Sequence, residues 1–372
     1  MPGAVDDIWW LTETVEPDRS LIGGKASGLT MLLRAGARVP PGFVVTTAAF
    51  RRALPERVRA ELAVRIEALP PEPSMKRLDR LGAELRALVF EAAARHPGRA
   101  AIGAAYERLC RVVGEHPAAV AVRSSSAAED AAGASFAGEY DSYLWVAGED
   151  DVQERIRQCW ASLFTARAID YRRRGAVADE AMAVLVQQMV PARAAGVLMT
   201  LNPANGDRSK IAIESVWGLG EPLVSGRVNP DRFLVDKVTG DIVKRELASK
   251  PTELVADTGG CGVTTNEIEP ERRDVASLSD GQLAELRRIG RSIEGFARSP
   301  QDVEFATSGP APDEVFIVQT RPETVWSRRP RPAVTAPGGG GAVEAVVSTL
   351  VGIADRTRWT GRKDGGDPSV SA

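Results

Sequence analysis

Histidine and cysteine are scarce in this sequence, and long apolar runs are absent. Its 372 residues include only two histidines, His96 and His116, and three cysteines, Cys110, Cys159 and Cys261, with no Cys-x-x-Cys pair. This pattern argues against a disulfide framework and a zinc site, so we expect buried, reduced thiols. No apolar run reaches the roughly 18 residues of a membrane span, and no basic segment followed by an apolar one opens the chain. We therefore expect a cytoplasmic protein without a membrane partner.

An excess of charge of either sign is also absent. The formal net charge is -3, and Lys and Arg are spread along the chain, so we expect no nucleic-acid partner. Hydrophobic residues make up 44% of the chain and charged residues 26%, which is typical of a folded globular protein. A chain of this length can form two lobes that each bury a core.

The spacing of apolar residues changes along the chain and predicts an α+β fold. VPPGFVVTTAAF (39–50) reads as a strand, and residues 51–96 read as helical, interrupted by the breaker PPEP at 70–73. Ser279-x-x-Gln282 is a capping box that predicts a later helix. Between these helical regions lie short runs typical of strands, which are AVLVQQMV, GVLMTL, KIAIESV, RFLVDK and DIVKREL.

The change from helical to strand spacing also predicts the domain organisation. We expect an N-terminal lobe over residues 1–185 and a C-terminal lobe over residues 186–326. Residues 327–372 are expected to form a linker and flexible tail, because the run RRPRPAVTAPGGGG has the composition of a linker.

Three polar clusters stand out, and the first is Gly23-Gly24-Lys25. Paired glycines let the backbone approach a ligand, and a lysine at the start of a helix adds a positive charge beside amides that favour an anion. The cluster is not a Walker P-loop, because GxxxxGK[ST] is absent. A plain turn is the alternative interpretation.

The second cluster is AVRSSSAAEDAAGASFAGEYDSYLWV, residues 121–146. Arg123 stands at the end of an apolar strand, and its guanidinium suits phosphate oxygens. Ser124 to Ser126 could offer hydroxyls, and the small residues around Gly138 would let a loop cover a polyphosphate with its backbone amides. An exposed surface loop of Ser, Ala and Gly is the alternative.

The third cluster is Asp302-x-Glu304 on one strand and Gln319-x-Arg321 on the next. Strand alternation puts the two carboxylates on one face, and likewise Gln319 and Arg321. Carboxylate and amide oxygens fit Mg²⁺, which prefers a few such ligands together with water and phosphate. A solvated sheet face with an ion pair is the alternative.

Two further stretches have polar residues next to strands. Gln187 and Gln188 interrupt the apolar run VLVQQMV and could read the edge of a purine between two lobes, or simply lie at a strand edge. Trp217-Gly218-Leu219-Gly220-Glu221 follows another strand, where glycines indicate either close approach of the backbone to a ligand or a bulge.

In this order, the segments resemble the nucleotide-binding N-terminal region of phosphoenolpyruvate synthase, pyruvate phosphate dikinase and rifampin phosphotransferase. The resemblance runs from about Leu21 to Val325. It implies an ATP-grasp fold, in which two α+β lobes clamp ATP. The most specific motifs are GGKASGL, AVRSSSAAEDAAGASFAGEYDSYLWV, VQQMV, ESVWGLGEPLVSGRVNPDRF, and DVEF with FIVQTRPET.

The resemblance also implies roles for the residues that match these motifs. Lys25 and Arg123 would grip the phosphates, Arg321 would contact the transferring phosphoryl group, and these three would be the catalytic residues. Asp302, Glu304 and Gln319 would lie near Mg²⁺. The ATP-binding set would further include Gly138 in the covering loop, Ser142, where relatives often have threonine, and Gln187 or Gln188 beside adenine.

The family's phosphohistidine motif, similar to TGGxxSH, has no counterpart here, since His96 lies in ARHPG and His116 in GEHPA. We therefore expect a stand-alone ATP-binding subunit that passes the β-phosphoryl group of Mg-ATP to a histidine of a separate partner protein and releases AMP. The final acceptor would be a small molecule: a phenol-like alcohol, as in the split relative phenylphosphate synthase, or pyruvate or an antibiotic. A non-catalytic ATP sensor and a direct small-molecule kinase are the alternatives.

Overall fold

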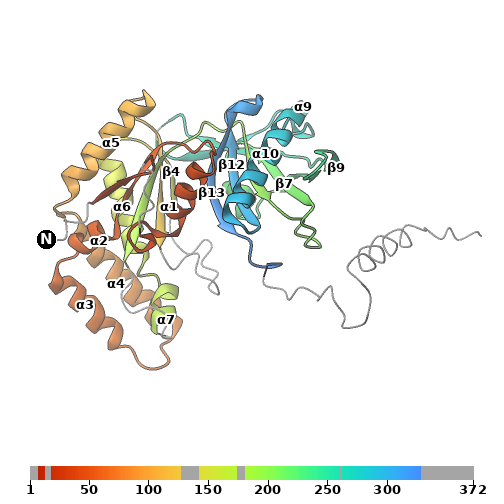
Figure 1. The fold of residues 1–372 in the computed structure, drawn as a ribbon. Coiled ribbons are helices and arrows are strands. Elements are labelled where there is room, and N and C mark those ends of the chain that lie inside the picture. The colour runs from red at the N-terminus through yellow and green to blue at the C-terminus, as the bar shows by residue number, and fades with distance from the viewer. Residues whose placement is uncertain (1–6, 13–17, 127–141, 174–180, 260, 328–372) are drawn as a thin grey trace, which may run out of the picture. The chain divides into compact units, whose positions relative to one another are not determined.

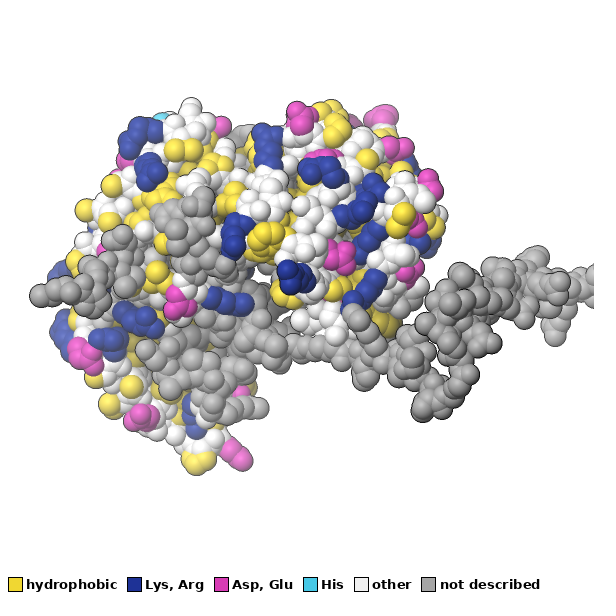
Figure 2. All heavy atoms as spheres, in the orientation of Figure 1, with side chains coloured by type: hydrophobic (Ala, Val, Ile, Leu, Met, Phe, Trp, Pro, Cys, Tyr) yellow, Lys and Arg dark blue, Asp and Glu magenta, His cyan; other side chains and the backbone are white. Residues whose placement is uncertain are grey.

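The computed structural model describes residues 7–12, 18–126, 142–173, 181–259 and 261–327. The chain divides into two units, 1–327 and 328–372, and only the first contains described residues. Within that described part, no helix is both long and apolar enough to cross a membrane. Figure 2 shows basic and acidic side chains interspersed on one face, in keeping with the small net charge of the sequence.

The first sheet has five strands in the order β1-β2-β5-β3-β4, all antiparallel to their neighbours. Helices pack on one of its faces around a core that includes Phe43, Val122 and Trp160. The strands are β1 (Ile8–Trp10), β2 (Gly42–Val45), β3 (Val120–Ser126), β4 (Ser142–Val146) and β5 (Met182–Gln188). The helices are α2 (Thr47–Ala53), α3 (Glu56–Glu67), α4 (Met75–Ala93), α5 (Arg99–Val113), α6 (Glu149–Ser162) and α7 (Ala166–Arg173).

The second sheet has six antiparallel strands in the order β13-β12-β6-β7-β8-β9. One of its faces packs on α10 (Asp280–Ala297), whose Leu286 and Ile293 are fully buried. The expected capping box opens this helix, with Ser279 and Gln282 bonded reciprocally. The strands are β6 (Ala194–Met199), β7 (Lys210–Trp217), β8 (Asp231–Asp236), β9 (Ile242–Glu246), β12 (Gln301–Thr307) and β13 (Val315–Pro322).

Helix α1 (Arg19–Arg34) packs against both sheets and joins their cores. Its buried Ile22, Leu29 and Leu32 belong to one apolar cluster with Leu185 of the first sheet and Ile317 of the second. Figure 1 shows α1 beside β13. The two sheets are therefore built on a shared core, and a smaller apolar cluster that includes Ala195 of β6 and Ala306 of β12 lies apart from it.

A small hairpin extends from the second sheet to the first. It consists of β10 (Thr252–Ala256) and β11 (Val263–Glu267), and a bridge between Gly218 and Leu254 ties it to the end of β7. At its tip the amide of Gly262 donates to the carbonyl of Trp145 in β4, at 3.0 Å. The remaining short elements are α8 (Glu221–Val224), α9 (Pro270–Arg273) and the 3₁₀ turn η1 (Pro312–Glu314).

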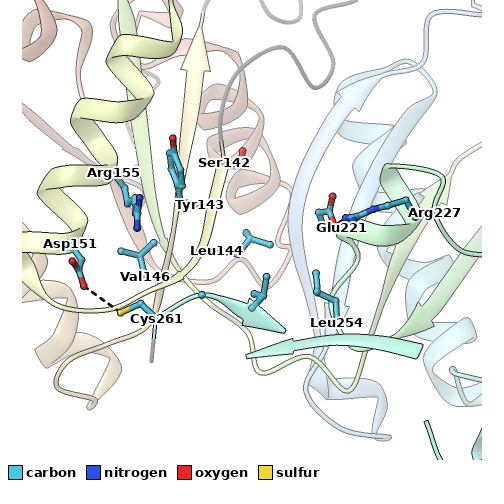
Figure 3. A pocket seen from close by; sticks show the side chains of 12 residues that line it. Ser142, Tyr143, Leu144, Val146, Asp151, Arg155, Glu221, Arg227, Leu254 and Cys261 are labelled. Atoms are coloured by element: carbon cyan, nitrogen blue, oxygen red, sulfur yellow. Dashed lines mark hydrogen bonds and ion pairs between the residues drawn. The ribbon is translucent and has the colours of Figure 1, made fainter. Parts of the chain in front are cut away.

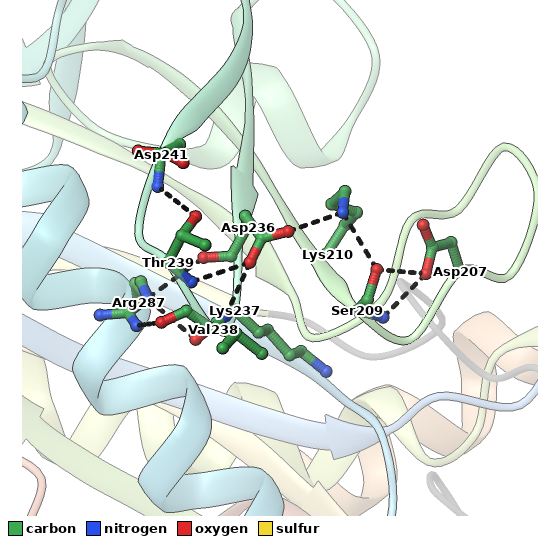
Figure 4. A network of polar contacts seen from close by, with 9 residues as sticks. All are labelled: Asp207, Ser209, Lys210, Asp236, Lys237, Val238, Thr239, Asp241 and Arg287. Atoms are coloured by element: carbon green, nitrogen blue, oxygen red, sulfur yellow. Dashed lines mark hydrogen bonds and ion pairs between the residues drawn. The ribbon is translucent and has the colours of Figure 1, made fainter. Parts of the chain in front are cut away.

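The β8–β9 turn is fixed by one carboxylate. Asp236 accepts hydrogen bonds from the amides of Val238 and Thr239 and pairs with Lys210 at 2.7 Å, as Figure 4 shows. Arg287 of α10 donates to the carbonyls of the same turn, so the turn also links the helix to the sheet. The hydrogen bond from Lys210, followed by those from the turn amides, holds the pKa of Asp236 below its ordinary value.

Most of the expected elements are present, and the mixed α+β class is confirmed. The run TTAAF was expected to continue a strand, but it starts α2, because the hydroxyl of Thr46 caps the helix by accepting from the amide of Ala49. The lobe boundary expected between residues 185 and 186 falls inside β5, which belongs wholly to the first sheet. The change of sheet therefore takes place over residues 189–193.

The expectation for the cysteines is confirmed at two positions and wrong at the third. Cys110 and Cys159 are buried free thiols. Cys261 is exposed, because it lies in the tip of the β10–β11 hairpin, where its sulfur is 3.5 Å from the carbonyl of Ala147 and 3.4 Å from the carboxylate of Asp151.

Candidate nucleotide-binding site

Gly23 of the first cluster lets α1 dock tightly on β3. Gly23 has φ 76° and ψ 177°, a backbone conformation that essentially only glycine adopts, and a Cβ there would lie 1.8 Å from the carbonyl oxygen of Ser125. The Ser125 hydroxyl fills the resulting break in the helix by donating to the carbonyl of Ile22 and accepting from the amide of Ala26. This hydroxyl, expected to be offered to a ligand, is used inside the protein instead.

This docking places Lys25 beside Ser124 of β3. Its Nζ donates to the carbonyl of Ser124 at 2.9 Å and lies 3.5 Å from the Ser124 hydroxyl. A second glycine, Gly28, sets the distance from α1 to β13, because a Cβ there would lie 3.0 Å from the carbonyl oxygen of Thr320. The motif GGKASGL thus fixes a lysine beside β3 and holds β13 close to it.

Arg123 reaches from the first sheet to the second. Its guanidinium donates to the carbonyl of Val318 at 3.2 Å and to the side-chain oxygen of Gln319, and it lies 3.7 Å from the carboxylate of Glu304. The side chain is only 14% exposed. In the ladder of β3 and β4, Ser142 lies directly opposite Arg123. Two of the three polar clusters therefore meet at this arginine.

The third cluster forms two cross-strand pairs on β12 and β13. Asp302 lies opposite Arg321, with 3.3 Å between carboxylate and guanidinium, and Glu304 lies opposite Gln319. Burial is the main cause that raises the pKa of Asp302 above its ordinary value, although Arg321 acts in the other direction. The predicted set of oxygens is thus assembled along one strand pair.

The donor set fits a hard cation. The oxygens of Glu304 and Gln319 already face one cationic group, the guanidinium of Arg123, and carboxylate and amide oxygens are what Mg²⁺ prefers. Among the described residues, no group of three or more His, Cys, Asp and Glu side chains could hold a metal ion. A metal here would consequently need few protein ligands, as Mg²⁺ bound to substrate phosphates does.

The two glutamines of β5 differ in their surroundings. Gln187 is 2% exposed, and its side-chain amide donates to the carbonyl of Pro40. It lies opposite Ala121, and hence on the same face of the first sheet as Arg123. Gln188 ends the strand and is partly exposed. The amide group of Gln187 therefore has a partner within the protein, whereas Gln188 stands where the chain leaves the first sheet.

A cavity of about 430 Å³ opens between β4 and the hairpin. Figure 3 shows Ser142, Leu144 and Tyr143 on β4, with Glu221 and Arg227 across from them. Its volume lies within the range of small-molecule sites. Ser142 is the predicted site residue that lines it. The part of the hairpin that lines this cavity could not be recognised from the sequence, because the contact between the hairpin tip and β4 joins residues far apart in the chain.

The remaining residues that were expected to approach a ligand either lie outside the described residues or contact the protein itself. Gly138 lies outside the described residues. The close approach expected at Gly218 is to the chain itself, because a Cβ there would lie 2.4 Å from the carbonyl oxygen of Leu254. Ser124 and Ser126 are buried in β3.

Sequence comparisons find relatives that match most of this chain. Phosphoenolpyruvate synthase of Aeropyrum pernix is 38% identical over 89% of this chain and 44% of its own length. A rifampicin phosphotransferase of Streptomyces sviceus is 40% identical over 84% of this chain and 35% of its own length. The prodigiosin synthesizing transferase PigC of Serratia marcescens is 37% identical over 85% of this chain and 33% of its own length. The chain thus spans less than half the length of these relatives.

A crystal structure of a Pyrococcus horikoshii Ot3 protein aligns over 84% of this chain and 94% of its own, with 10% identity and a TM-score of 0.35, which is too low to support an argument about the fold. The family model described as the pyruvate phosphate dikinase AMP/ATP-binding domain matches residues 19–337. This range includes Lys25, Arg123, the carboxylates of β12 and the end of β13. The chain belongs to the pyruvate phosphate dikinase AMP/ATP-binding domain family.

Proposed function

We propose that this chain is the ATP-binding part of a dikinase-type phosphotransferase. It binds Mg-ATP between two ATP-grasp lobes, transfers the β,γ-pyrophosphoryl group to a histidine of a partner protein, and releases AMP. The observation that carries this proposal is the meeting of Arg123 of the first sheet with Glu304 and Gln319 of the second, while Lys25 of α1 bonds to Ser124, the residue after Arg123. Family membership supports the use of ATP.

Each group has a distinct part in the proposed reaction. Lys25 and Arg123 hold the phosphate oxygens, and Arg321 offsets charge on the transferring group. Asp302, Glu304 and Gln319 would hold Mg²⁺, which supplies positive charge to the phosphates. Further ATP contacts come from Ser142, from the loop of Gly138, and from Gln188 or Gln187 beside the purine. Catalysis of this kind rests on positioning and charge neutralisation.

The bond changes are simple. A nitrogen of the partner's imidazole forms a bond to the β-phosphorus while the bond from this phosphorus to the α,β-bridging oxygen breaks, and AMP leaves with that oxygen. Neither histidine of this chain suits the acceptor role. His96 is 7% exposed and packs edge-on against Trp160, and His116 is 3.1 Å from the carboxylate of Glu107. In this proposal the acceptor histidine belongs to a partner protein, and the small-molecule substrate of the whole system is reached through it.

Binding and product analysis test this proposal. Calorimetry should show Mg-ATP binding by the chain and at least about a tenfold loss for Lys25→Met, since one charge-assisted hydrogen bond contributes about 1.5–3 kcal/mol. Lys76→Met is the matched control, because Lys76 is an exposed lysine of α4. Chromatography of the nucleotides should show AMP only when a histidine-bearing protein encoded beside this chain is added.

Three results would contradict the proposal. Absence of Mg-ATP binding would refute the site itself. Formation of ADP in place of AMP would favour a direct small-molecule kinase, and binding without any product in the presence of the partner would favour an ATP sensor.

A further inference from the structure

The guanidinium of Arg123 lies where a metal ion would have to bind. One of its nitrogens bonds to the side-chain oxygen of Gln319 and lies 3.7 Å from Glu304, and both oxygens belong to the proposed Mg²⁺ set. We infer that Arg123 is an internal counter-ion that keeps these oxygens from binding a divalent cation until nucleotide phosphates draw the guanidinium away. The inference rests on the proposed function and deepens it.

The contacts of Arg123 let its guanidinium take the place of a metal ion. Its other terminal nitrogen donates to the carbonyl of Val318, so the guanidinium is held by two residues of β13 while it faces Glu304. The side chain is 14% exposed, and that of Glu304 is 29% exposed, so water screens the pair only in part. A divalent cation cannot join these oxygens without placing like charges side by side.

Arg321 differs from Arg123 in a way that matters for this inference. It pairs with Asp302 on the neighbouring strand, but its side chain is 48% exposed, so it can turn into water without leaving a buried charge. Arg123 comes from the other sheet and has its partners on β13 and β12. Phosphate oxygens are stronger partners for a guanidinium than a neutral amide oxygen, and they can therefore draw Arg123 away.

The inference predicts an order of binding. Without nucleotide, the chain should have little affinity for Mg²⁺, because Arg123 neutralises Glu304 and occupies Gln319. With ATP bound, the same two oxygens become available to the metal. Metal and nucleotide should therefore bind with positive coupling that depends on Arg123.

Titration of Mn²⁺, a spectroscopic substitute for Mg²⁺, tests this in the full chain without nucleotide. Electron paramagnetic resonance of free Mn²⁺ should show at least about tenfold tighter binding by Arg123→Gln than by the wild type, since hydrogen bonds to charged groups are the strong ones. Arg232→Gln is the matched control, because it removes an equal charge from the exposed pair of Arg232 and Glu214, which lies on the same sheet as Glu304. This control should bind Mn²⁺ as the wild type does.

Two further variants make the result specific. Glu304→Gln added to Arg123→Gln should abolish the gain in Mn²⁺ affinity, and Arg123→Lys, which keeps the charge, should show less gain than Arg123→Gln. Thermal unfolding of each variant checks that it is folded. Equal Mn²⁺ affinity of folded Arg123→Gln and wild type would overturn the inference, as would an equal gain in Arg232→Gln. Tighter Mn²⁺ binding by Arg123→Gln in a chain that does not bind ATP would support the counter-ion and refute only the proposed function.

Discussion

Replacing Gly23 with alanine tests how α1 is docked on β3. Gly36 is the matched control, because it has nearly the same φ, +77° against +76°, but a Cβ there would meet no atom within 4 Å. Gly36→Ala should therefore show only the cost of an L-residue in the left-handed region, about 1–2 kcal/mol. At Gly23 the added Cβ would also collide with the carbonyl of Ser125, whose hydroxyl makes two hydrogen bonds to α1.

The larger effect at Gly23 can be estimated from these contacts. A backbone conformation restricted to glycine costs about 1–3 kcal/mol, and loss of the two Ser125 hydrogen bonds adds about 1 kcal/mol each. The expected loss is thus about 4 kcal/mol for Gly23→Ala, measured by urea unfolding followed through tryptophan fluorescence. Mg-ATP affinity should fall as well, because Lys25 depends on the same docking. If the two variants lost stability equally, to within about 0.5 kcal/mol, the tight approach of α1 to β3 would be refuted.

Three other predictions concern residues other than the proposed phosphate and metal ligands. Asp231→Ala should lower the free energy of unfolding by about 3–5 kcal/mol in urea titrations, because it leaves the buried ammonium of Lys250, 2.6 Å away, without its carboxylate; a loss below about 1 kcal/mol would contradict this. Asp236→Asn should lower the melting temperature at neutral pH, and the difference from wild type should shrink as the pH falls below 3.8. The reason is that the pKa of Asp236 is lower in the folded chain than the ordinary 3.8, so the ionised carboxylate stabilises the fold above pH 3.8 and this contribution is lost as the carboxylate is protonated. A difference in melting temperature that stays constant as the pH falls would contradict this prediction. In the native chain, a thiol reagent followed by absorbance should react rapidly with Cys261 alone, and rapid reaction of Cys110 or Cys159 would show that the core around them is open.

The residue types of the site could be identified from the sequence, but their meeting could not. Gly-Gly-Lys, the arginine and the alternating carboxylates each had a local alternative, and the arginine expected at the end of a strand in fact lies in the middle of β3. The resemblance to a family gave their common purpose. Their actual contacts depend on residues about 100 to 200 positions apart, such as Lys25 with Ser124 and Arg123 with Gln319, and no local pattern encodes such pairs.

The errors in the fold have local physical causes. TTAAF has the β-branched composition of a strand, yet Thr46 caps α2, which begins at Thr47. The lobe boundary was placed too early because VLVQQMV is apolar almost throughout, so its sequence does not show which sheet it joins. Cys261 was expected to be buried because cysteine usually is, and a hairpin tip cannot be recognised from the residue alone.

The hairpin tip gives the chain a built-in reporter of motion. The amide of Gly262 is hydrogen-bonded to Trp145 of the first sheet, while the base of the hairpin is tied to the second sheet at Leu254. If the sheets separate while the hairpin keeps its shape, this hydrogen bond breaks. Deuterium uptake at a single backbone position would then record how often the molecule opens, with no label attached and no ligand present.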